Sequence, residues 1–394
     1  MAGKEENRFI NIILPLVISF ISMVPLYSCS GREASDGYTD GMILIAREGR
    51  GALYEKDGKR ILLIQGDHYE MGFQHGVLLK EEVSELSHKV VEISESLEPG
   101  VLQSIWEKQA EYIPDRFLEE LRGISEGAQV SFETIKLANI MPELFHCSGI
   151  AVFGDATADG TLYHSRILDY NVEYGLQNYS IVVIAMPKDY NSYINATFAG
   201  FSGSVTGMND SHVAIGEMGG GGYGDWSGVP MAFVIKRALE EAGTLEQAVD
   251  IFRDSKRTCE YYYVISDSKT NDARAIYATP DKFITLKPGG SDPRLPVPLM
   301  PDTLIVTGED RFPVLYSRIK ENYGKIDFDI MIDIMKRPVS MNENLHNAIF
   351  HPKTLMMKLA VARESSVPDF QACNQEYHEF DLGKLISFAE RKLK

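Results

Sequence analysis

Cys147 is the residue whose type and surroundings best suit covalent chemistry. It lies in the run Phe145-His146-Cys147-Ser148-Gly149, where helical periodicity gives way to strand-like alternation. A thiol at such a junction can sit at the exposed start of a strand, and its thiolate form is a strong nucleophile. Free cysteines, however, are more often small buried apolar residues. Position alone therefore favours a structural role for Cys147, and a catalytic role needs support from further residues.

Arg166 and Asp169 supply that support at the end of the next predicted strand. A hairpin would return both residues to the side of Cys147. A nearby cation favours the thiolate, and a base must accept the thiol proton. If Cys147 became N-terminal, its own amino group, with a pKa near ~8, could be that base. The alternative interpretation is an ion pair that only stabilises the strand end.

Other chemical signals in the sequence are weak. Gly219, Gly221 and Gly224 satisfy a GxGxxG pattern, but they lie in a glycine-rich run that continues into 225–228 rather than into a helix, which argues against a dinucleotide site. We interpret the run either as a mobile loop over the site or as a plain surface loop. The segment 200–204 lacks the last glycine of GxSxG, so no serine-hydrolase elbow is indicated.

The cysteines and histidines indicate no metal centre. The chain has four cysteines and nine histidines, without a CxxC pair or the Cys/His spacing of a zinc site. We therefore expect no metal or other cofactor. Cys29 belongs to an N-terminal segment that predicts lipidation, as described below. If it carries a lipid, Cys147, Cys259 and Cys373 are left for disulfide pairing. Three is an odd number, so at least one thiol is free or paired between molecules.

The elements around Cys147 predict an α+β fold in one domain, residues 59–394. The part before Cys147 is mainly helical, and the part after it has strand runs interspersed with paired helices, without strict βαβ alternation. Expected strands are 61–64, 149–153, 162–166, 180–186, 193–199, 212–216, 261–266, 273–278, 283–286 and 355–361. Expected helices are 67–94, 99–110, 114–126, 131–144, 229–242, one opened by Thr244, 327–336 and one from Leu382.

The first residues read as an export signal rather than as part of the fold. Lys4 and Arg8 precede the apolar stretch 10–26, and Leu26-Tyr27-Ser28-Cys29 follows. This pattern resembles a bacterial lipobox, which predicts a signal peptide 1–28, lipidation of Cys29 and a tether 29–58. The protein is then exported and membrane-anchored, on the periplasmic or cell-surface side. An uncleaved membrane anchor is the alternative.

The overall charge argues against a nucleic-acid partner. The chain carries 56 acidic and 39 basic residues, a formal net charge of −17, and shows no basic stripe. Such a surface repels phosphate backbones. A small molecule is the expected partner, and the oligomeric state stays open.

Several ordered motifs resemble one known family. Cys147-Ser148 is followed by a strand, a turn and the S-R-x-L-D-Y run 165–170; upstream lie a G-x-x-x-x-x-G-x-x-x-G-like segment at 65–76 and an N-x-x-x-E run at 139–143. Downstream lie Gly207-Met208-Asn209-Asp210 and Asp310-Arg311-Phe312. The set spans roughly residues 59 to 380 and resembles the N-terminal-nucleophile hydrolases grouped around acyl-coenzyme A:6-aminopenicillanate acyltransferase. More distantly it is similar to choloylglycine hydrolases and penicillin V acylases.

This resemblance implies an αββα sandwich and a role for each matched residue. Cys147 would cut the His146–Cys147 bond and then act as the nucleophile, leaving chains 30–146 and 147–394. Arg166 and Asp169 would order its thiol and amine, Asn209 would help bind the oxyanion, and Arg311 would brace the site. The sequence departs from the family's pattern at three places. His146 stands where the acyltransferase has glycine, and Ile167 replaces a common asparagine. The stretch 258–263, where a later oxyanion asparagine is expected, contains no asparagine.

The implied activity is hydrolysis of a linear amide bond in an N-acyl or peptide-like small molecule, through a thioester. Acyl transfer within the same family is an alternative, although an exported protein would not meet coenzyme A. A non-catalytic binding lipoprotein that keeps the fold is the other alternative, and the substituted stretch 258–263 is its best support.

Overall fold

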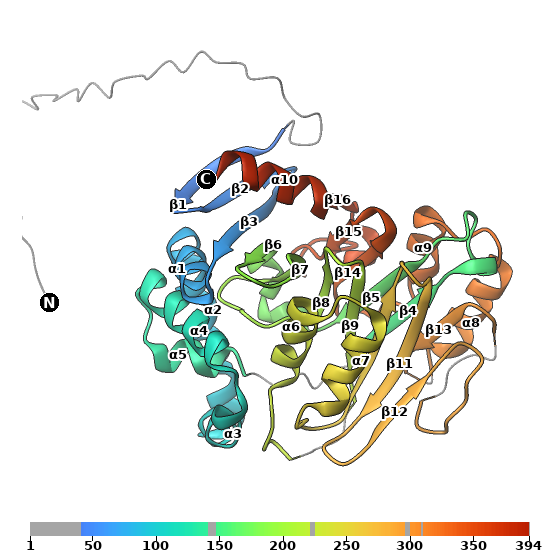
Figure 1. The fold of residues 1–394 in the computed structure, drawn as a ribbon, viewed down its shortest axis with the longest axis horizontal. Helices are drawn as coiled ribbons and strands as arrows, with labels where there is room; N and C mark the ends of the chain where they lie inside the picture. Colours follow the sequence, from blue (N-terminus) through green and yellow to red (C-terminus); the bar gives the residue numbers. More distant parts are fainter. Residues whose placement is uncertain (1–40, 141–146, 221–224, 296–299, 309, 394) are drawn as a thin grey trace, which may run out of the picture. The chain divides into compact units, whose positions relative to one another are not determined.

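Two stacked β-sheets form the centre of the computed structural model, which describes residues 41–140, 147–220, 225–295, 300–308 and 310–393 (Figure 1). The larger sheet has the strand order β1 (Ile43–Glu48), β2 (Gly51–Lys56), β3 (Lys59–Gly66), β6 (Ser180–Pro187), β7 (Tyr193–Phe198), β8 (Thr206–Asn209), β9 (Val213–Gly219), β10 (Tyr261–Asp267), β11 (Asp272–Ala278) and β12 (Phe283–Leu286). The smaller sheet has the order β13 (Thr303–Val306), β4 (Ser148–Val152), β5 (Tyr163–Asp169), β14 (Asn344–His351), β15 (Met356–Val361) and β16 (His378–Asp381). Neighbouring strands are antiparallel, except that β3 and β6 run parallel.

Helices cover the outer face of each sheet. The helices are α1 (His68–Leu78), α2 (Lys80–Leu97), α3 (Val101–Gln109), α4 (Asp115–Ala128), α5 (Phe132–Ala138), α6 (Met231–Glu241), α7 (Leu245–Asp254), α8 (Phe312–Glu321), α9 (Phe328–Met335) and α10 (Leu382–Lys392). Helices α1, α4, α6 and α7 share one apolar cluster with the larger sheet, and α8 and α9 share another with the smaller sheet. The layers are therefore helix, sheet, sheet and helix, which confirms the predicted α+β sandwich.

Alternation along the central strands explains this layering. In β4, Ile150 and Val152 pack toward α8 and α9, whereas Ala151 packs between the sheets. In β10, Tyr261 and Tyr263 belong to the cluster under α6 and α7, and Tyr262 lies on the other face. Successive side chains of a strand point to opposite faces, so each strand serves two apolar layers. Burying one large aliphatic side chain in these layers contributes about 1.5–3 kcal/mol.

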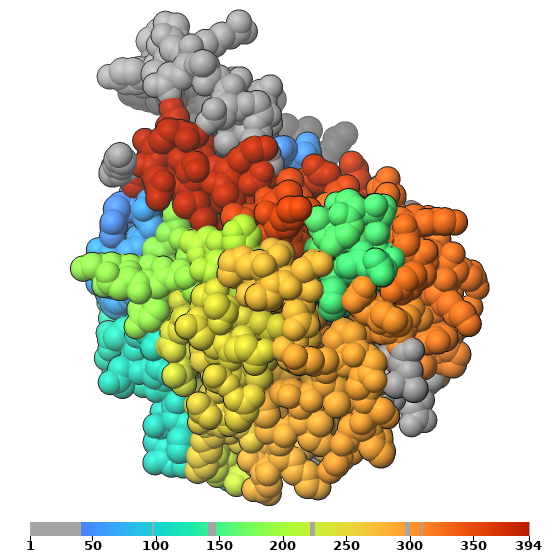
Figure 2. Space-filling view, turned by 45° about the vertical axis from the view of Figure 1, so that its right-hand side comes forward, coloured from blue at the N-terminus to red at the C-terminus, as the bar shows by residue number. Residues whose placement is uncertain are grey.

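Residues before Cys147 contribute strands as well as helices. Strand β3 pairs in parallel with β6, and Ile61 lies opposite Val182. Residues 43–56, which the sequence predicts to be part of a tether, instead form β1 and β2 at the edge of the larger sheet. Helix α10 packs there through Phe388, whose ring centroid is 5.5 Å from that of Tyr54. The C-terminal residues (red) border the first strands (blue) in Figure 2.

The glycines of the 65–76 motif bring α1 and α4 into direct backbone contact. A Cβ on Gly72 would lie 2.0 Å from the carbonyl oxygen of Glu120, and a Cβ on Gly76 would lie 2.4 Å from that of Ile124. Gly123 and Gly127 on α4 face α1 just as closely. Only residues without a Cβ permit this approach, which explains the G-x-x-x-G spacing.

The predicted elements differ from the observed ones at several places. The predicted helix 67–94 is two helices, which meet at Leu79. The elements β8, β13, α8, β14 and β16 were not among the predicted ones. No helix among the described residues is long and apolar enough to cross a lipid bilayer.

Candidate active site

Cys147 immediately precedes β4 and packs between the two sheets. Its side chain shares an apolar cluster with Ala151, Met218 and Val264, and the residue is only 3% exposed. Strand β4 forms an antiparallel hairpin with β5, in which Gly149 lies opposite Arg166. The hairpin expected from the sequence therefore forms, and it brings Arg166 beside the cysteine.

Arg166 contacts the thiol directly. Its Nη2 lies 3.4 Å from Sγ of Cys147, and the arginine is fully buried. The same Nη2 lies 3.1 Å from Oε2 of Glu217, and Nε donates to the Glu217 carbonyl at 2.9 Å. A guanidinium next to sulfur favours the thiolate. The pairing with Glu217 offsets the cost of burying the arginine charge.

Glu217 is a site residue that the sequence reasoning missed. It is fully buried in β9, where its neighbours in the strand are apolar or glycine. A glutamate inside such a run is a signal of a buried partner, because unpaired carboxylates are almost never fully buried. The structure pairs Arg166 with Glu217, so the alternative interpretation of an Arg166–Asp169 ion pair is wrong.

Asp169 and Arg311 form a second buried ion pair that reaches the backbone of Cys147. Arg311, at the N-terminus of α8, donates from Nη1 to Oδ2 of Asp169 at 2.6 Å and from Nη2 to the Cys147 carbonyl at 3.0 Å. The other oxygen of Asp169 accepts from the Met341 N–H at 3.0 Å and from Asn344 Nδ2 at 3.1 Å. Burial raises the pKa of the Asp169 carboxyl, and Arg311 together with these hydrogen bonds opposes the rise. Arg311 thus connects Asp169 to the backbone of Cys147.

Asn209 does not reach this site, and its predicted oxyanion role is corrected. Its side-chain amide donates to the carbonyls of Leu239 and Ala242 at 2.9 and 2.8 Å, and its oxygen accepts from the Val213 N–H at 2.9 Å. These bonds hold the end of α6 and the β8–β9 turn. Asn209 lies beside the first residue of β9, whereas the residues near Cys147 are at the other end of that strand.

A cavity of about 370 Å³ opens beside Cys147. Its lining includes Met218, Gly219, Gly220, Tyr262, Arg294, Val306, Thr307 and Gly308. Thr307 follows β13, whose last residue pairs with Gly149, and its Oγ1 lies 2.6 Å from Oγ of Ser148. Gly219 and Gly220, at the start of the glycine-rich run, thus border the site. Residues 221–224 of that run lie outside the described residues.

The predicted cleavage point and lipid site lie outside the described residues, because 1–40 and 141–146 are not described; this applies to Cys29 and His146. Asn139 of the N-x-x-x-E run is described and buried. Its Nδ2 donates to the Gly200 carbonyl at 2.9 Å, and its oxygen accepts from the Ser202 N–H at 2.8 Å. The residue therefore ties the segment before the predicted cut to the chain after it.

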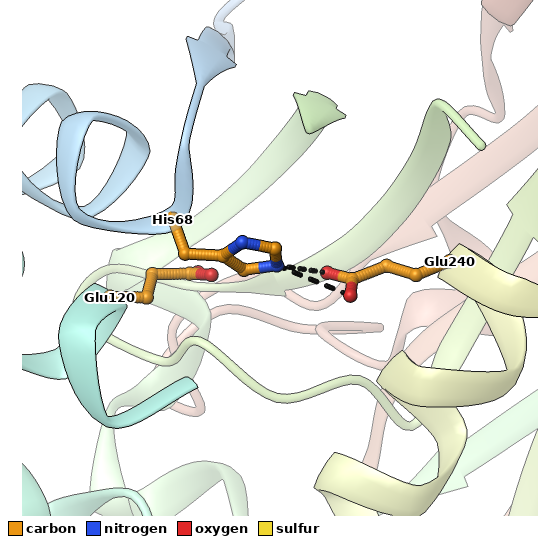
Figure 3. A group of neighbouring side chains, drawn as sticks. All are labelled: His68, Glu120 and Glu240. Carbon is orange, nitrogen blue, oxygen red and sulfur yellow. Dashed lines mark hydrogen bonds and ion pairs between the residues drawn. The ribbon is translucent and has the colours of Figure 1, made fainter. Parts of the chain in front are cut away.

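A second buried cluster contains residue types that bind metals. His68, Glu120 and Glu240 bring one ligand atom each within 4.8 Å of one another, and His68 Nε2 lies 3.1 Å from Glu240 (Figure 3). A cation is already present, because the fully buried Lys236 ammonium lies 2.5 Å from Glu120 and 3.9 Å from Glu240. Arg116 also pairs with Glu240. We interpret the cluster as an ion network that joins α1, α4 and α6.

Comparisons with known proteins agree with the motifs. No family model matches the chain. Protein dcd1B of Dictyostelium discoideum is 24% identical over 88% of this chain and 79% of its own length. The N-acylethanolamine-hydrolyzing acid amidase of Caenorhabditis elegans is 23% identical over 72% of this chain and 89% of its own length. Among solved structures, a variant of the conjugated bile acid hydrolase from Clostridium perfringens has a TM-score of 0.41 and 13% identity, covering 60% of this chain and 93% of that one.

The resemblance predicted from the motifs around Cys147 is therefore confirmed. Curated relatives that share most of the chain's length include an amide hydrolase, and the described residues form the sandwich that the resemblance implies. Over 72% of its length, the chain is thus similar to an enzyme that hydrolyses amide bonds.

Proposed function

We propose that this protein is a self-cleaving cysteine hydrolase that cuts a linear amide bond of an N-acyl small molecule. The observation that carries the proposal is the 3.4 Å contact between Arg166 Nη2 and Cys147 Sγ, at the wall of a cavity large enough for a small substrate. The ion pair of Asp169 with Arg311, which binds the Cys147 carbonyl, supports it independently.

The first step of the proposal is cleavage between His146 and Cys147. It consumes one water and leaves a carboxylate on His146 and a free amine on Cys147. With the signal peptide 1–28 removed, the two chains are 29–146 and 147–394. Several buried contacts support continued association of the two chains: the parallel pairing of β3 with β6, the Asn139 bonds, and the ion pair of Lys236 with Glu120.

The second step is acyl transfer to Cys147. The free amine of Cys147, with a pKa near ~8, accepts the thiol proton, and the thiolate attacks the substrate carbonyl carbon. A C–S bond forms and the C–N bond breaks, while the proton passes to the leaving nitrogen. Water then attacks the thioester, releases the carboxylic acid and restores the thiol. The proposed cycle needs no cofactor.

Thr307 replaces Asn209 as the proposed side-chain donor for the oxyanion. Thr307 lines the same cavity as Cys147, and Ser148 Oγ lies 2.6 Å from its Oγ1, close enough to donate to it. The Thr307 proton would then be available to the cavity. A preorganised donor of this kind typically contributes 10²–10³-fold in kcat, about 2.7–4 kcal/mol. Thr307→Val should show a loss of that order, and Thr307→Ser should recover most of it.

Two cavities support an apolar acyl group and a more polar leaving amine. The lining of the cavity beside Cys147 includes the polar residues Tyr262, Arg294 and Thr307. A separate small cavity of about 70 Å³ is lined almost entirely by apolar residues, including Leu168 and Leu345, which share the apolar cluster of Cys147. A hydrocarbon acyl chain would gain about 0.8 kcal/mol for each buried CH₂. The nematode relative is named for hydrolysis of N-acylethanolamines, which carry such an acyl group.

Export and lipid anchoring remain part of the proposal. A signal peptide 1–28 and lipidation of Cys29 would hold the enzyme at the membrane on its periplasmic or cell-surface side. That compartment lacks coenzyme A, which favours hydrolysis over acyl transfer. Globomycin treatment, which blocks lipoprotein signal cleavage, should raise the mass of the N-terminal chain; an unchanged mass would remove the anchor from the proposal.

A substrate series tests the activity itself. N-acyl ethanolamines and N-acyl glycines with acyl chains of two to sixteen carbons should be incubated with the cleaved protein, with bile-salt conjugates and penicillin V in parallel. We expect amine release that rises with chain length, and a Cys147 peptide carrying the acyl mass after acid quenching. A cleaved, folded protein that hydrolyses none of them and forms no acyl adduct would favour the non-catalytic binding lipoprotein.

A further inference from the structure

A layer of polar side chains lies between the two sheets, behind Cys147. His164 and Arg166 come from β5, His346 from β14 and Glu217 from β9, and all four are at most 2% exposed. Buried polar groups in native proteins are hydrogen-bonded almost without exception, so the contacts within this layer determine the role of each member.

The guanidinium of Arg166 is held on two sides. Nε and Nη2 bond to Glu217, as described above, and Nη1 lies 3.4 Å from Nε2 of His346. Arginine can only donate, so Nε2 of His346 must be an acceptor and its proton must be on Nδ1. Burial and the charge of Arg166 hold the pKa of His346 well below its usual value, which keeps the ring neutral.

The charge that acts on the pKa of His346 is that of Arg166, which is itself paired with Glu217. Thr206 Oγ1 lies 3.2 Å from the same Nε2, and the Phe198 ring stacks on the imidazole at 6.4 Å between centroids. These contacts fix the plane of the His346 ring. Its Nε2 therefore presents its lone pair to Arg166 Nη1 from a fixed direction.

We propose that His346 is a positioning residue for the reaction: its neutral imidazole fixes the rotation of the Arg166 guanidinium so that Nη2 faces the Cys147 thiol. This inference rests on the proposed function of Cys147. Loss of the acceptor removes one of the hydrogen bonds that orient the buried guanidinium. With the bonds to Glu217 kept, the guanidinium is then less constrained on its Nη1 side, and Nη2 can shift relative to sulfur.

His164 provides a matched control. It is as deeply buried in the same layer, only two residues before Arg166, and its pKa is lowered by burial to about 3. Its Nδ1 lies 2.7 Å from Ser266 Oγ, so its hydrogen bond goes to serine instead of arginine. Replacement of His164 disturbs packing and polarity in the layer to a similar extent while leaving the acceptor of Arg166 in place.

The experiment compares His346→Phe, His346→Leu and His346→Gln with His164→Leu in the full chain. Phenylalanine keeps a ring against Phe198 but removes the acceptor, and glutamine restores an acceptor oxygen. Two readouts are measured: the pH dependence of Cys147 alkylation by iodoacetamide, located by peptide mass, and kcat and KM on a responsive amide. Melting curves accompany each variant.

We expect the acceptor-free His346 variants to raise the midpoint pH of alkylation and to lower kcat at least tenfold without a matching rise in KM. His346→Gln should recover most of both, and His164→Leu should match the wild type. Equal effects of the His346 and His164 variants would overturn the proposal. So would loss of folding in both acceptor-free His346 variants while His164→Leu folds, since His346 would then serve stability alone. The alkylation readout does not depend on turnover, so it separates this inference from failure of the proposed activity, which Cys147→Ala tests.

Discussion

Replacing Asp169 with asparagine removes one charge from the site at nearly constant size. Both carboxylate oxygens of Asp169 face donors: Oδ2 faces Arg311, and Oδ1 faces the Met341 N–H and Asn344. An asparagine has one acceptor oxygen and one NH₂ group. Either orientation of the amide therefore sets a donor against a donor, and the change cannot be accommodated by a simple flip.

The burial of the pair sets the magnitude. The side chains of Arg311 and Asp169 are 4% and 2% exposed. Breaking an exposed ion pair costs about 0–1 kcal/mol, whereas removing one partner of a buried pair costs about 3–5 kcal/mol because it leaves an uncompensated charge. We therefore expect Asp169→Asn to lower the free energy of unfolding by about 3–5 kcal/mol.

Activity should fall as well, because Arg311 also holds the Cys147 carbonyl at 3.0 Å. We expect kcat to decrease by about 100-fold, which corresponds to about 2.7 kcal/mol in the barrier. Arg311→Met completes a double-mutant cycle. Because the two groups act as one unit, the double variant should be far less destabilised than the sum of the single variants.

The assay is urea unfolding of each variant, together with turnover and the extent of self-cleavage measured by mass. An Asp169→Asn protein within about 1 kcal/mol of the wild type, with near-normal kcat, would refute the assignment of Asp169 to the site. Additive single and double variants would refute the coupling through Arg311.

Three further predictions concern the packing and charge around the site. Gly76→Ala should destabilise the protein by about 1–3 kcal/mol or more, because its Cβ would lie 2.4 Å from a backbone oxygen, whereas Gly383→Ala, whose Cβ would meet Leu355 at 3.5 Å, should be neutral or slightly stabilising; equal melting temperatures would contradict this. Lys236→Met should lower the free energy of unfolding by about 3–5 kcal/mol because Glu120 loses its buried cation, and a change below about 1 kcal/mol would show that the network is not held by charge. Burial lowers the folded-state pKa of His164 to about 3, below an unfolded value near 6.5, so its contribution to the free energy of unfolding is complete above pH 6.5 and is lost as pH falls toward 3, by about 1.4 kcal/mol per pH unit. In His164→Leu, the free energy of unfolding measured with urea should therefore depend on pH less steeply by that slope. Parallel curves for the variant and the wild type would contradict this prediction.

The hairpin at Cys147 could be predicted from sequence because it is local. The two strands β4 and β5 are short alternating runs separated by turn residues, so their pairing placed Arg166 near the thiol without further information. The partners of these residues come from distant parts of the chain. Glu217 is 51 residues beyond Arg166, and Arg311 is 142 residues beyond Asp169, so spacing gave no means of pairing them.

The sequence-based predictions that differ from the structure also have physical causes. Strand β14 was missed because polar residues such as His346 and Asn347 lie on both of its faces, which removes the apolar alternation that identifies a strand. Residues 43–56 were also assigned wrongly, to a tether: Ile43–Glu48 is an exposed edge strand, and Gly51–Lys56 is buried only through its pairing and packing with other elements. For Asn209, the motif gave the residue type and strand position, but the direction of its side chain depends on the carbonyls at the end of α6, which no local pattern reveals.

The central claim is that Cys147 becomes an N-terminal nucleophile, and the most direct test is N-terminal sequencing of purified, hydrolytically active protein, with Cys147→Ala as the matched variant. We predict a chain that begins Cys-Ser-Gly-Ile in the wild type and no such chain in Cys147→Ala. Cys259 and Cys373, which are also buried but lie outside the site, should be replaceable by alanine without loss of cleavage. A single active chain with the His146–Cys147 bond intact would contradict the account.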